Sequence, residues 1–364
     1  MNVCIVGDGL TSLTLAKNLI NKKINVHLYK KDKIRNLSPG RTIGISKNNL
    51  KFFRKEIHNY SKKKTWEIKK IEIYSEKIKN DKIFNFENKN NLFYLVKNEE
   101  FYRSLKDELI KSKYYKTIKI KNNNYYKKLL SEKKYDLIIN CDSNNPISKK
   151  YFFKKVEKDY FNFAYTTILK HKKLNNNIAT QVFTKSGPIA FLPISNYETS
   201  VVCSLESKKR KYSESEVLDL IKKHNTKLKI NKILKLNIFK LKSSYLRNYH
   251  YKNILAFGDS LHKIHPLAGQ GFNMTIRDIK TLSIIIQNKI DLGLQLDSLV
   301  LKEFENKTKN INFIFLNGID FIYEFFNFNR KNKNEKLNKI LKIIGSNKNI
   351  NDAFISFADN GIII

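Results

Sequence analysis

The sequence predicts an α/β fold in which one sheet is assembled from separate segments and a second sheet is inserted between them. Two glycine-bearing turns, one near residue 7 and one near residue 258, each follow a short apolar strand pattern and precede a helix pattern. Several strand-like segments lie between the two turns. The chain after about residue 300 is helical in pattern, so we expect a helical C-terminal part.

The N-terminal turn has the pattern of a dinucleotide-binding turn. Residues 3–6 are apolar and predict a buried strand, and a helix with an apolar inward side is expected directly afterwards. In the intervening Gly7-x-Gly9-x-x-Ser12, Gly7 allows the tight turn and Gly9 lets a pyrophosphate approach the backbone. Ser12 takes the third glycine position, where the helix packs on the strand and a small residue is needed.

The second turn also joins a strand to a helix and carries more polar residues. Residues 254–257 predict a buried strand that a Gly-Asp pair ends, and a Gly-Gln-Gly triplet opens the next helix. A carboxylate at the end of a strand can bind a sugar hydroxyl, and a glycine-flanked helix start lets backbone N–H groups approach an anion. In order, the residues are Gly258, Asp259, His262, His265, Pro266, Gly269, Gln270 and Gly271.

Continued through Phe272, Asn273 and Asp278, this order resembles the second FAD fingerprint of the aromatic-ring flavin monooxygenases, in the form found in ubiquinone-biosynthesis hydroxylases. The resemblance implies a Rossmann-like FAD-binding domain of the GR2 type, as in para-hydroxybenzoate hydroxylase, with an inserted β-sheet substrate domain. It also implies the cofactor-binding residues, which are Gly7, Gly9, Ser12, Lys30, Arg41, Asn98, Asp142, Gly258, Asp259, Pro266, Gly269, Gln270, Gly271, Phe272 and Asn273.

Three of these residues come from other segments that resemble the family. Arg41 follows a loop and is expected on the flavin side of the site, and Asn98 corresponds to a polar residue near FAD. Asp142 ends a predicted strand and matches the aspartate of the family's Asp-Gly motif, with Ser143 in place of the glycine.

Lys30 departs from the family pattern in charge. It ends the second predicted strand, residues 25–29, where the family has an acidic residue that binds the adenosine ribose of FAD. Lysine cannot accept a hydrogen bond from a hydroxyl group. Three alternatives remain open: Asp32 reaches the ribose, the backbone serves, or FAD is held less tightly.

Residues 181–193 match a segment typical of the ubiquinone hydroxylases. Two strand patterns joined by a Gly-Pro turn predict a hairpin that covers the pocket above the flavin. Because the two fingerprints lie far apart, we expect a discontinuous FAD-binding domain with a substrate domain inserted in it. The expected boundaries are 1–65, 96–150 and 250–300 for the first, 66–95 and 151–249 for the second, and 301–364 for the C-terminal helical region.

The resemblance implies a hydroxylation chemistry. NAD(P)H reduces FAD, O₂ adds to give a flavin C4a-hydroperoxide, and one oxygen atom passes to the ring of a polyprenylphenol in ubiquinone biosynthesis. Backbone N–H groups at residues 269–271 would stabilise negative charge on the flavin. His262, His265 and Pro266 are the candidate catalytic residues, although the pattern equally allows both histidines to be structural hydrogen-bonding residues.

Composition limits the other function classes. The net charge of +37 suggests a nucleic-acid partner, but only eight of the 70 basic residues are arginine, and the lysines are spread along the chain. We therefore expect no specific nucleic acid and a general attraction to anionic membranes. The three cysteines stand alone and no metal-ligand spacing is evident, which predicts free thiols and no metal site.

The expected surroundings are cytoplasmic, with peripheral contact to the inner face of the membrane and to other quinone-biosynthesis proteins. No signal peptide and no apolar run of the roughly 18 residues that span a bilayer is evident. A lysine-flanked helix around residues 337–344 predicts either an interfacial helix on acidic lipid or an ordinary solvated face.

A competing hypothesis is a weakly catalytic or non-catalytic family member. In that case the protein would serve as an assembly or lipid-binding subunit of the quinone-biosynthesis machinery. The substitutions Lys30, Ser12 and Ser143 motivate this alternative.

Overall fold

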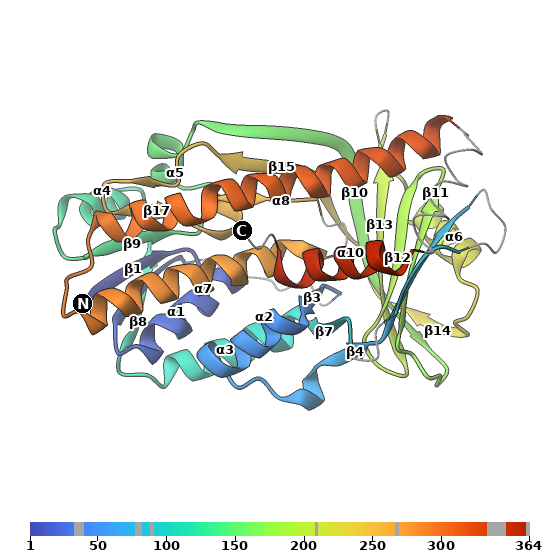
Figure 1. The fold of residues 1–364 in the computed structure, drawn as a ribbon, viewed down its shortest axis with the longest axis horizontal. Coiled ribbons are helices and arrows are strands. Elements are labelled where there is room, and N and C mark those ends of the chain that lie inside the picture. The colour runs from blue at the N-terminus through green and yellow to red at the C-terminus, as the bar shows by residue number, and fades with distance from the viewer. Residues whose placement is uncertain are drawn as a thin grey trace.

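The computed structural model describes residues 1–32, 40–76, 82–87, 91–207, 210–265, 269–332 and 347–361. It contains a parallel sheet with helices, a large and mainly antiparallel sheet, and a small third sheet between them (Figure 1). The predicted α/β fold class, with its inserted sheet and helical C-terminal part, is confirmed.

The first sheet has the order β16-β17-β9-β1-β2-β8, and all neighbours are parallel except β16 and β17. Its strands come from distant segments and are almost continuously apolar at the centre, because both faces are covered. They are β1 (Asn2–Val6), β2 (Asn25–Lys31), β8 (Tyr115–Ile120), β9 (Leu137–Asn140), β16 (His250–Tyr251) and β17 (Ile254–Ala256).

Helices α1 (Leu10–Asn21), α3 (Asn98–Ile110) and α7 (Gln270–Asp291) lie in front of this sheet in Figure 1, and α1 packs against both others. The inward side of α1 is apolar, as expected, because Leu13, Ala16 and Leu19 are buried. The remaining short helices of this half are α2 (Lys47–Phe52), η1 (Phe53–Ile57), η2 (Lys62–Lys64), α4 (Asn124–Ser131), α5 (Pro146–Tyr151) and η3 (Gly258–Ser260).

The large sheet has the order β18-β15-β10-β13-β12-β11-β5-β6, with β14 also paired to β10. The predicted hairpin of residues 181–193 is confirmed, since β11 and β12 pair antiparallel around a turn in which Gly187 has φ +137°. A Cβ at Gly187 would lie 2.0 Å from the Ser204 carbonyl oxygen, so no other residue fits. The strands are β5 (Lys70–Ser75), β6 (Lys82–Glu87), β10 (Lys155–His171), β11 (Ile178–Thr184), β12 (Gly187–Pro193), β13 (Glu198–Glu206), β14 (Ile230–Ile233), β15 (Asn237–Leu246) and β18 (His262–Lys263).

The third sheet joins the two others and has the order β3-β7-β4. It consists of β3 (Thr42–Ser46), β7 (Phe93–Lys97) and β4 (Trp66–Ile68), all antiparallel. The strand patterns within residues 66–96 are therefore divided between two sheets, because β5 and β6 pair into the large sheet while β4 and β7 pair with β3.

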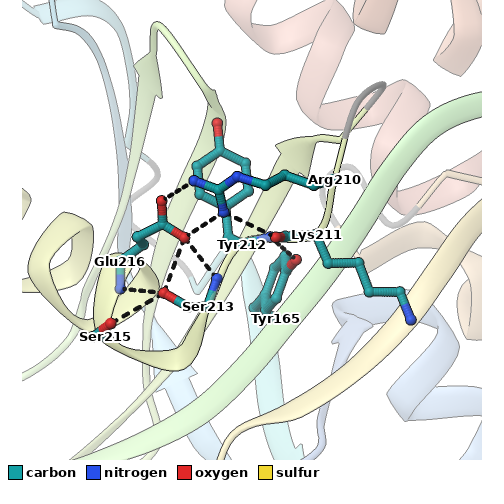
Figure 2. Close-up of polar contacts among 7 residues, drawn as sticks. All are labelled: Tyr165, Arg210, Lys211, Tyr212, Ser213, Ser215 and Glu216. Carbon is teal, nitrogen blue, oxygen red and sulfur yellow. Dashed lines mark hydrogen bonds and ion pairs between the residues drawn. The ribbon is translucent and has the colours of Figure 1, made fainter.

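Helix α6 (Glu214–His224) covers one face of the large sheet, and side chains fix its start. Ser213 and Glu216 form a capping box, with the Ser213 Oγ accepting from the Glu216 amide at 3.3 Å and the Glu216 Oε2 accepting from the Ser213 amide at 2.7 Å. Arg210 donates to the same carboxylate (Figure 2). The Tyr212 amide donates to the Tyr165 hydroxyl at 2.9 Å, which attaches the helix start to β10.

Helices α8 (Ser298–Asn332) and α10 (Lys348–Asn360) form the described C-terminal part, and α8 runs along most of the molecule (Figure 1). Polar residues of α8 face β10: the Tyr160 hydroxyl donates to Asp320, and the Lys158 Nζ lies 3.0 Å from Glu324. The lysine-flanked helix predicted around residues 337–344 lies outside the described residues. Of the helices in the described ranges, none has the length and apolar character needed to span a bilayer.

Candidate active site

A cavity of about 1000 Å³ lies where the three sheets meet. The β1–α1 turn, the start of α7, the β11–β12 hairpin and strands β5 and β6 all contribute to its lining, and α8 and α10 complete the wall. The cavity therefore combines segments from every part of the chain.

The N-terminal turn presents free backbone groups to this cavity. Gly7 has φ +112°, which gives the tight turn, and its amide donates to the Tyr29 carbonyl oxygen at 2.8 Å, which holds the start of the turn against β2. Gly9 is the N-cap of α1 and no side chain caps the helix; Ser12 is buried in its first turn. The first turn holds no acidic residue, so the positive end of the helix dipole is available to an anion.

The start of α7 faces the same cavity. Gly269 is the N-cap in the left-handed conformation, with φ +64°, and again no side chain caps the helix. Gln270 and Gly271 line the cavity, and the Gln270 Oε1 is buried without a hydrogen-bond partner among the described residues. Two uncapped helix N-termini from opposite ends of the chain thus open into one space, as the two fingerprints predict.

Asn273 lines the cavity but serves mainly to hold its walls together. Its Nδ2 donates to the Gly44 carbonyl oxygen at 3.0 Å, and its Oδ1 accepts from the Ser46 amide at 2.9 Å and from the Asn49 side chain at 3.0 Å. The side chain therefore attaches β3 and α2 to the first turn of α7. Its neighbour Phe272 lines the cavity and packs edge-on against Phe101.

Gly258 and Asp259 have different roles. Gly258 has φ +61°, and a Cβ there would lie 2.6 Å from the Thr11 methyl group, so glycine lets α1 approach the end of β17. Gly258 is not among the described residues that line the cavity, whereas Asp259 is. Gly258 therefore has a packing role, its predicted cofactor contact stays a prediction, and Asp259 lines the cavity.

Arg41 and Asn98 lie side by side, because the Asn98 amide donates to the Arg41 carbonyl oxygen at 3.0 Å. Both line the cavity together with Asp142 and Ser143. Asn98 is buried at the start of α3. The structure thus brings these separately predicted residues together.

Lys30 is not among the described residues that line the cavity, and its predicted cofactor contact stays a prediction. Strand β2 continues to Lys31, and it is Lys31, together with Tyr29, that lines the cavity among the described residues. Neighbouring residues of a strand point to opposite faces, so Lys30 faces away. The Lys31 Nζ lies 3.2 Å from the Asp142 carboxylate. Asp32, the alternative partner for the ribose, pairs with Lys119 at 2.9 Å instead.

The two histidines of the second turn differ in their surroundings. His262 is buried, and its Nε2 contacts the Asp278 carboxylate, which also accepts from the Asn312 side chain at 3.1 Å. Strand β18 carries His262 and pairs with β15, so this turn belongs to the large sheet as well as to the first domain. Asp278 therefore holds the His262 ring in place; His262 also lines the cavity, and its catalytic role stays a prediction.

His265 is 1% exposed and lines the cavity, and neither ring nitrogen has a hydrogen-bond partner among the described residues. Its ring lies between Tyr160 and Tyr323, at centroid distances of 4.8 and 4.4 Å. Burial, assisted by the charge of Lys158, lowers the pKa of His265 to about 3. The imidazole is therefore neutral at physiological pH and offers one donor and one acceptor to a ligand. Pro266, the third candidate catalytic residue, lies outside the described residues.

The sequence patterns did not indicate the apolar part of the cavity, which comes from β5, β6, α8 and α10. Its side chains are scattered along the chain and each looks like an ordinary core residue. They are Ile71, Ile73, Phe84, Phe86, Phe321, Ile322, Phe325, Phe354, Ile355 and Phe357.

Comparison with known proteins finds similarities to flavin-dependent enzymes. The FAD binding domain family matches residues 150–291. The chain is 37% identical over 92 residues to ubiquinone biosynthesis monooxygenase COQ6 of Dictyostelium discoideum, covering 25% of this chain and 19% of that protein. It is 32% identical over 155 residues to 3-demethoxyubiquinol 3-hydroxylase of Escherichia coli K12, covering 41% and 40%. Over these segments the chain is similar to FAD-dependent aromatic-ring monooxygenases.

Two solved structures share the fold over nearly the whole chain. The p-nitrophenol 4-monooxygenase PnpA of Pseudomonas putida superposes with a TM-score of 0.77 at 13% identity, covering 100% of this chain and 98% of that one. HpxO of Klebsiella pneumoniae, complexed with FAD, gives a TM-score of 0.73 at 12% identity, covering 98% of both. By contrast, the chain spans less than half the length of the two curated relatives described above.

The residues that line the cavity fit FAD, the cofactor in the name of the matching family model. The uncapped start of α1 suits the pyrophosphate, and the uncapped start of α7 with the unpartnered Gln270 oxygen suits a polar edge of the flavin ring. Asp259 offers acceptors for hydroxyl groups of the chain that joins the two.

Proposed function

We propose that this protein is an FAD-dependent monooxygenase that uses NAD(P)H and O₂ to hydroxylate the aromatic ring of a polyprenylphenol in ubiquinone biosynthesis. The observation that carries the proposal is the single cavity, which joins two uncapped helix N-termini to a buried, unpartnered histidine and an apolar wall. The names of the curated relatives support the substrate class.

Each part of the cavity has a chemical task in this proposal. Bound FAD would take electrons from NAD(P)H and activate O₂, and the protein would orient the reactants and exclude water. The backbone N–H groups at the start of α7 would stabilise negative charge that develops on the flavin. The neutral His265 would hydrogen-bond the phenol hydroxyl and orient the ring.

Purified protein reconstituted with FAD tests the proposal directly. With NAD(P)H, isotope-labelled O₂ and a polyprenylphenol, we expect a product that carries one labelled oxygen atom on the ring. NAD(P)H oxidation that yields only hydrogen peroxide with every such phenol would contradict the assigned substrate. Cells that lack the protein should accumulate one under-hydroxylated precursor, which would also identify the ring position.

One observation favours the alternative of a non-catalytic subunit. Lys31 pairs with Asp142 at 3.2 Å, so a lysine occupies the retained aspartate of the Asp-Gly segment on the cofactor side of the cavity. In that case the purified protein would be colourless and would still bind other quinone-biosynthesis proteins.

We also propose that the protein is cytoplasmic and contacts the inner face of the membrane peripherally. The net charge of +37 supports attraction to acidic lipid. The fraction of protein that co-sediments with vesicles should rise with the acidic lipid fraction and fall with salt. Binding that depends on neither would contradict an electrostatic contact.

A further inference from the structure

We infer that the apolar chain of the substrate leaves the cavity through an opening between β6, α8 and α10, and that Phe321 and Phe354 select substrates by this chain. The inference rests on the proposed function and adds to it a route and two specificity-determining residues. We call this opening the phenylalanine mouth, and it consists of Phe84, Phe86, Phe321, Phe325 and Phe354.

The aromatic rings of the mouth are arranged in two stacked pairs and a cross-link. Phe84 and Phe86 on β6 stack at 5.7 Å between centroids, and Phe321 and Phe325 on α8 stack at 6.1 Å. Phe354 on α10 meets both β6 rings edge-on, at 6.4 and 6.3 Å. Three elements that are distant in sequence therefore surround one apolar opening.

The mouth connects the cavity with the outside. Phe321 lines the cavity and is nevertheless 70% exposed, and Phe354 is 37% exposed, whereas Phe84 is 6% exposed. Strand β6 stands at the end of the large sheet, and α10 lies between α7 and that sheet (Figure 1). Contact between aromatic surface and water is unfavourable. An apolar chain that covers this surface would therefore be held there by the free energy of hydrophobic burial.

Cavity size requires such an exit for a long chain. A volume of about 1000 Å³ is at the upper limit for one drug-sized ligand, and here it must hold both FAD and an aromatic ring. Little space remains for a tail of several isoprene units, so a longer tail must pass beyond the wall. Three apolar residues of the described lining are also exposed: Phe321 and Phe354 belong to the mouth, and Phe239 on β15 is 43% exposed and stands apart from it.

The C-terminal end of α10 is hydrogen-bonded to the end of β3 and the start of α2, next to the expected flavin site. The Asp359 Oδ1 accepts from the Asn48 amide at 2.9 Å, and the Asp359 carbonyl oxygen accepts from the Ser46 hydroxyl at 3.2 Å. Ser46 is also bonded to Asn273 in the first turn of α7. One end of α10 therefore lies at the flavin side while Phe354 lies at the exit, which aligns the helix with the path of the chain.

The experiment uses the FAD-loaded protein and phenols with the same ring and increasing numbers of isoprene units. Dissociation constants are read from the change in flavin fluorescence, and hydroxylation is measured in parallel. We expect affinity to increase with chain length until the chain reaches the mouth and then to level off. Phe321→Asp should weaken binding of long-chain phenols on the order of tenfold and leave the chain-free phenol unchanged.

Leu299→Asp is the matched control, because Leu299 lies on the same helix, is 57% exposed and is not among the described lining residues. Its binding constants should match those of the unmodified protein. Phe354→Ala provides a second test, since it widens the mouth and should increase the tolerance for branched chains.

Separate outcomes overturn separate claims. If all chain lengths bind and react equally, or if Phe321→Asp weakens the chain-free phenol as much as the long ones, the mouth has no role and the proposed function stands. If no phenol of any length binds or reacts, both are wrong. If vesicle phospholipid displaces the long-chain phenol while Phe321→Asp has no effect on that phenol, the mouth is a lipid contact and the inference fails.

Discussion

Gly258→Ala tests the close approach on which the cofactor site depends. The added Cβ would lie 2.6 Å from the Thr11 methyl group and 3.2 Å from the Thr11 Cβ, and φ at this position is +61°. The left-handed conformation costs a non-glycine residue about 1–2 kcal/mol. Overpacking against a short β-branched side chain on α1 adds about 1–3 kcal/mol, since threonine has little freedom to move away. We expect unfolding free energy to fall by roughly 3 kcal/mol, together with weaker FAD binding.

Gly293→Ala separates the two contributions. Gly293 has φ +67°, but nothing lies within 4 Å of its added Cβ, so this variant carries only the backbone strain. Urea unfolding of both variants, with FAD titration, should show a larger loss for Gly258→Ala than for Gly293→Ala. Adding Thr11→Ala to Gly258→Ala removes the contacting methyl group. The loss of unfolding free energy should then fall to that of Gly293→Ala. Equal losses for the two alanine variants, or no restoration, would refute the contact.

Three further predictions concern the cavity walls. Lys31→Glu should tighten FAD binding in a direct titration, because it places a carboxylate that can accept from the ribose hydroxyls at the cavity side of the end of β2, whereas Lys30→Glu should change the dissociation constant less than about twofold; equal effects would contradict the assignment. Because burial depresses the pKa of His265 from 6.5 to about 3, the unfolded state binds more protons between these values, so stability is complete above pH 6.5 and falls below it by up to about 1.4 kcal/mol per pH unit. His265→Gln should remove this dependence in unfolding measurements from pH 4 to 8, and an unchanged slope would mean that the ring is protonated in the folded protein. Asn273→Ala should cost about 2–4 kcal/mol in urea unfolding, because it leaves the buried Ser46 amide unpaired and frees β3 from α7, and a loss under about 0.5 kcal/mol would show that another group replaces the side chain.

The sequence by itself determined the parts of the fold that depend on neighbouring residues. Two strand–turn–helix units, one at Gly7 and one whose helix begins after Gly269, follow from apolar runs and from glycines at positive φ. Both are local properties. The β11–β12 hairpin is local too, because its strands pair across a short turn at Gly187. The second FAD fingerprint could be noticed for the same reason, since all its residues lie within one short stretch of sequence.

Only the tertiary structure decided how distant segments meet. A strand pattern does not specify its partner strand, so the division of residues 66–96 between two sheets was not predictable. The same limit applies to Lys30 and Lys31. Neighbouring residues of a strand face opposite sides, and the local sequence does not show which side faces the cavity.

The chemistry of the site also depended on contacts that local patterns do not encode. The neutral state of His265 results from burial between Tyr160 and Tyr323, which are supplied by β10 and α8. The phenylalanine mouth exists because three separate elements place their rings around one opening. The sequence determined which residues can turn, cap and approach an anion, and long-range packing determined which of them share a cavity, because desolvation and side-chain contact depend on distance in space.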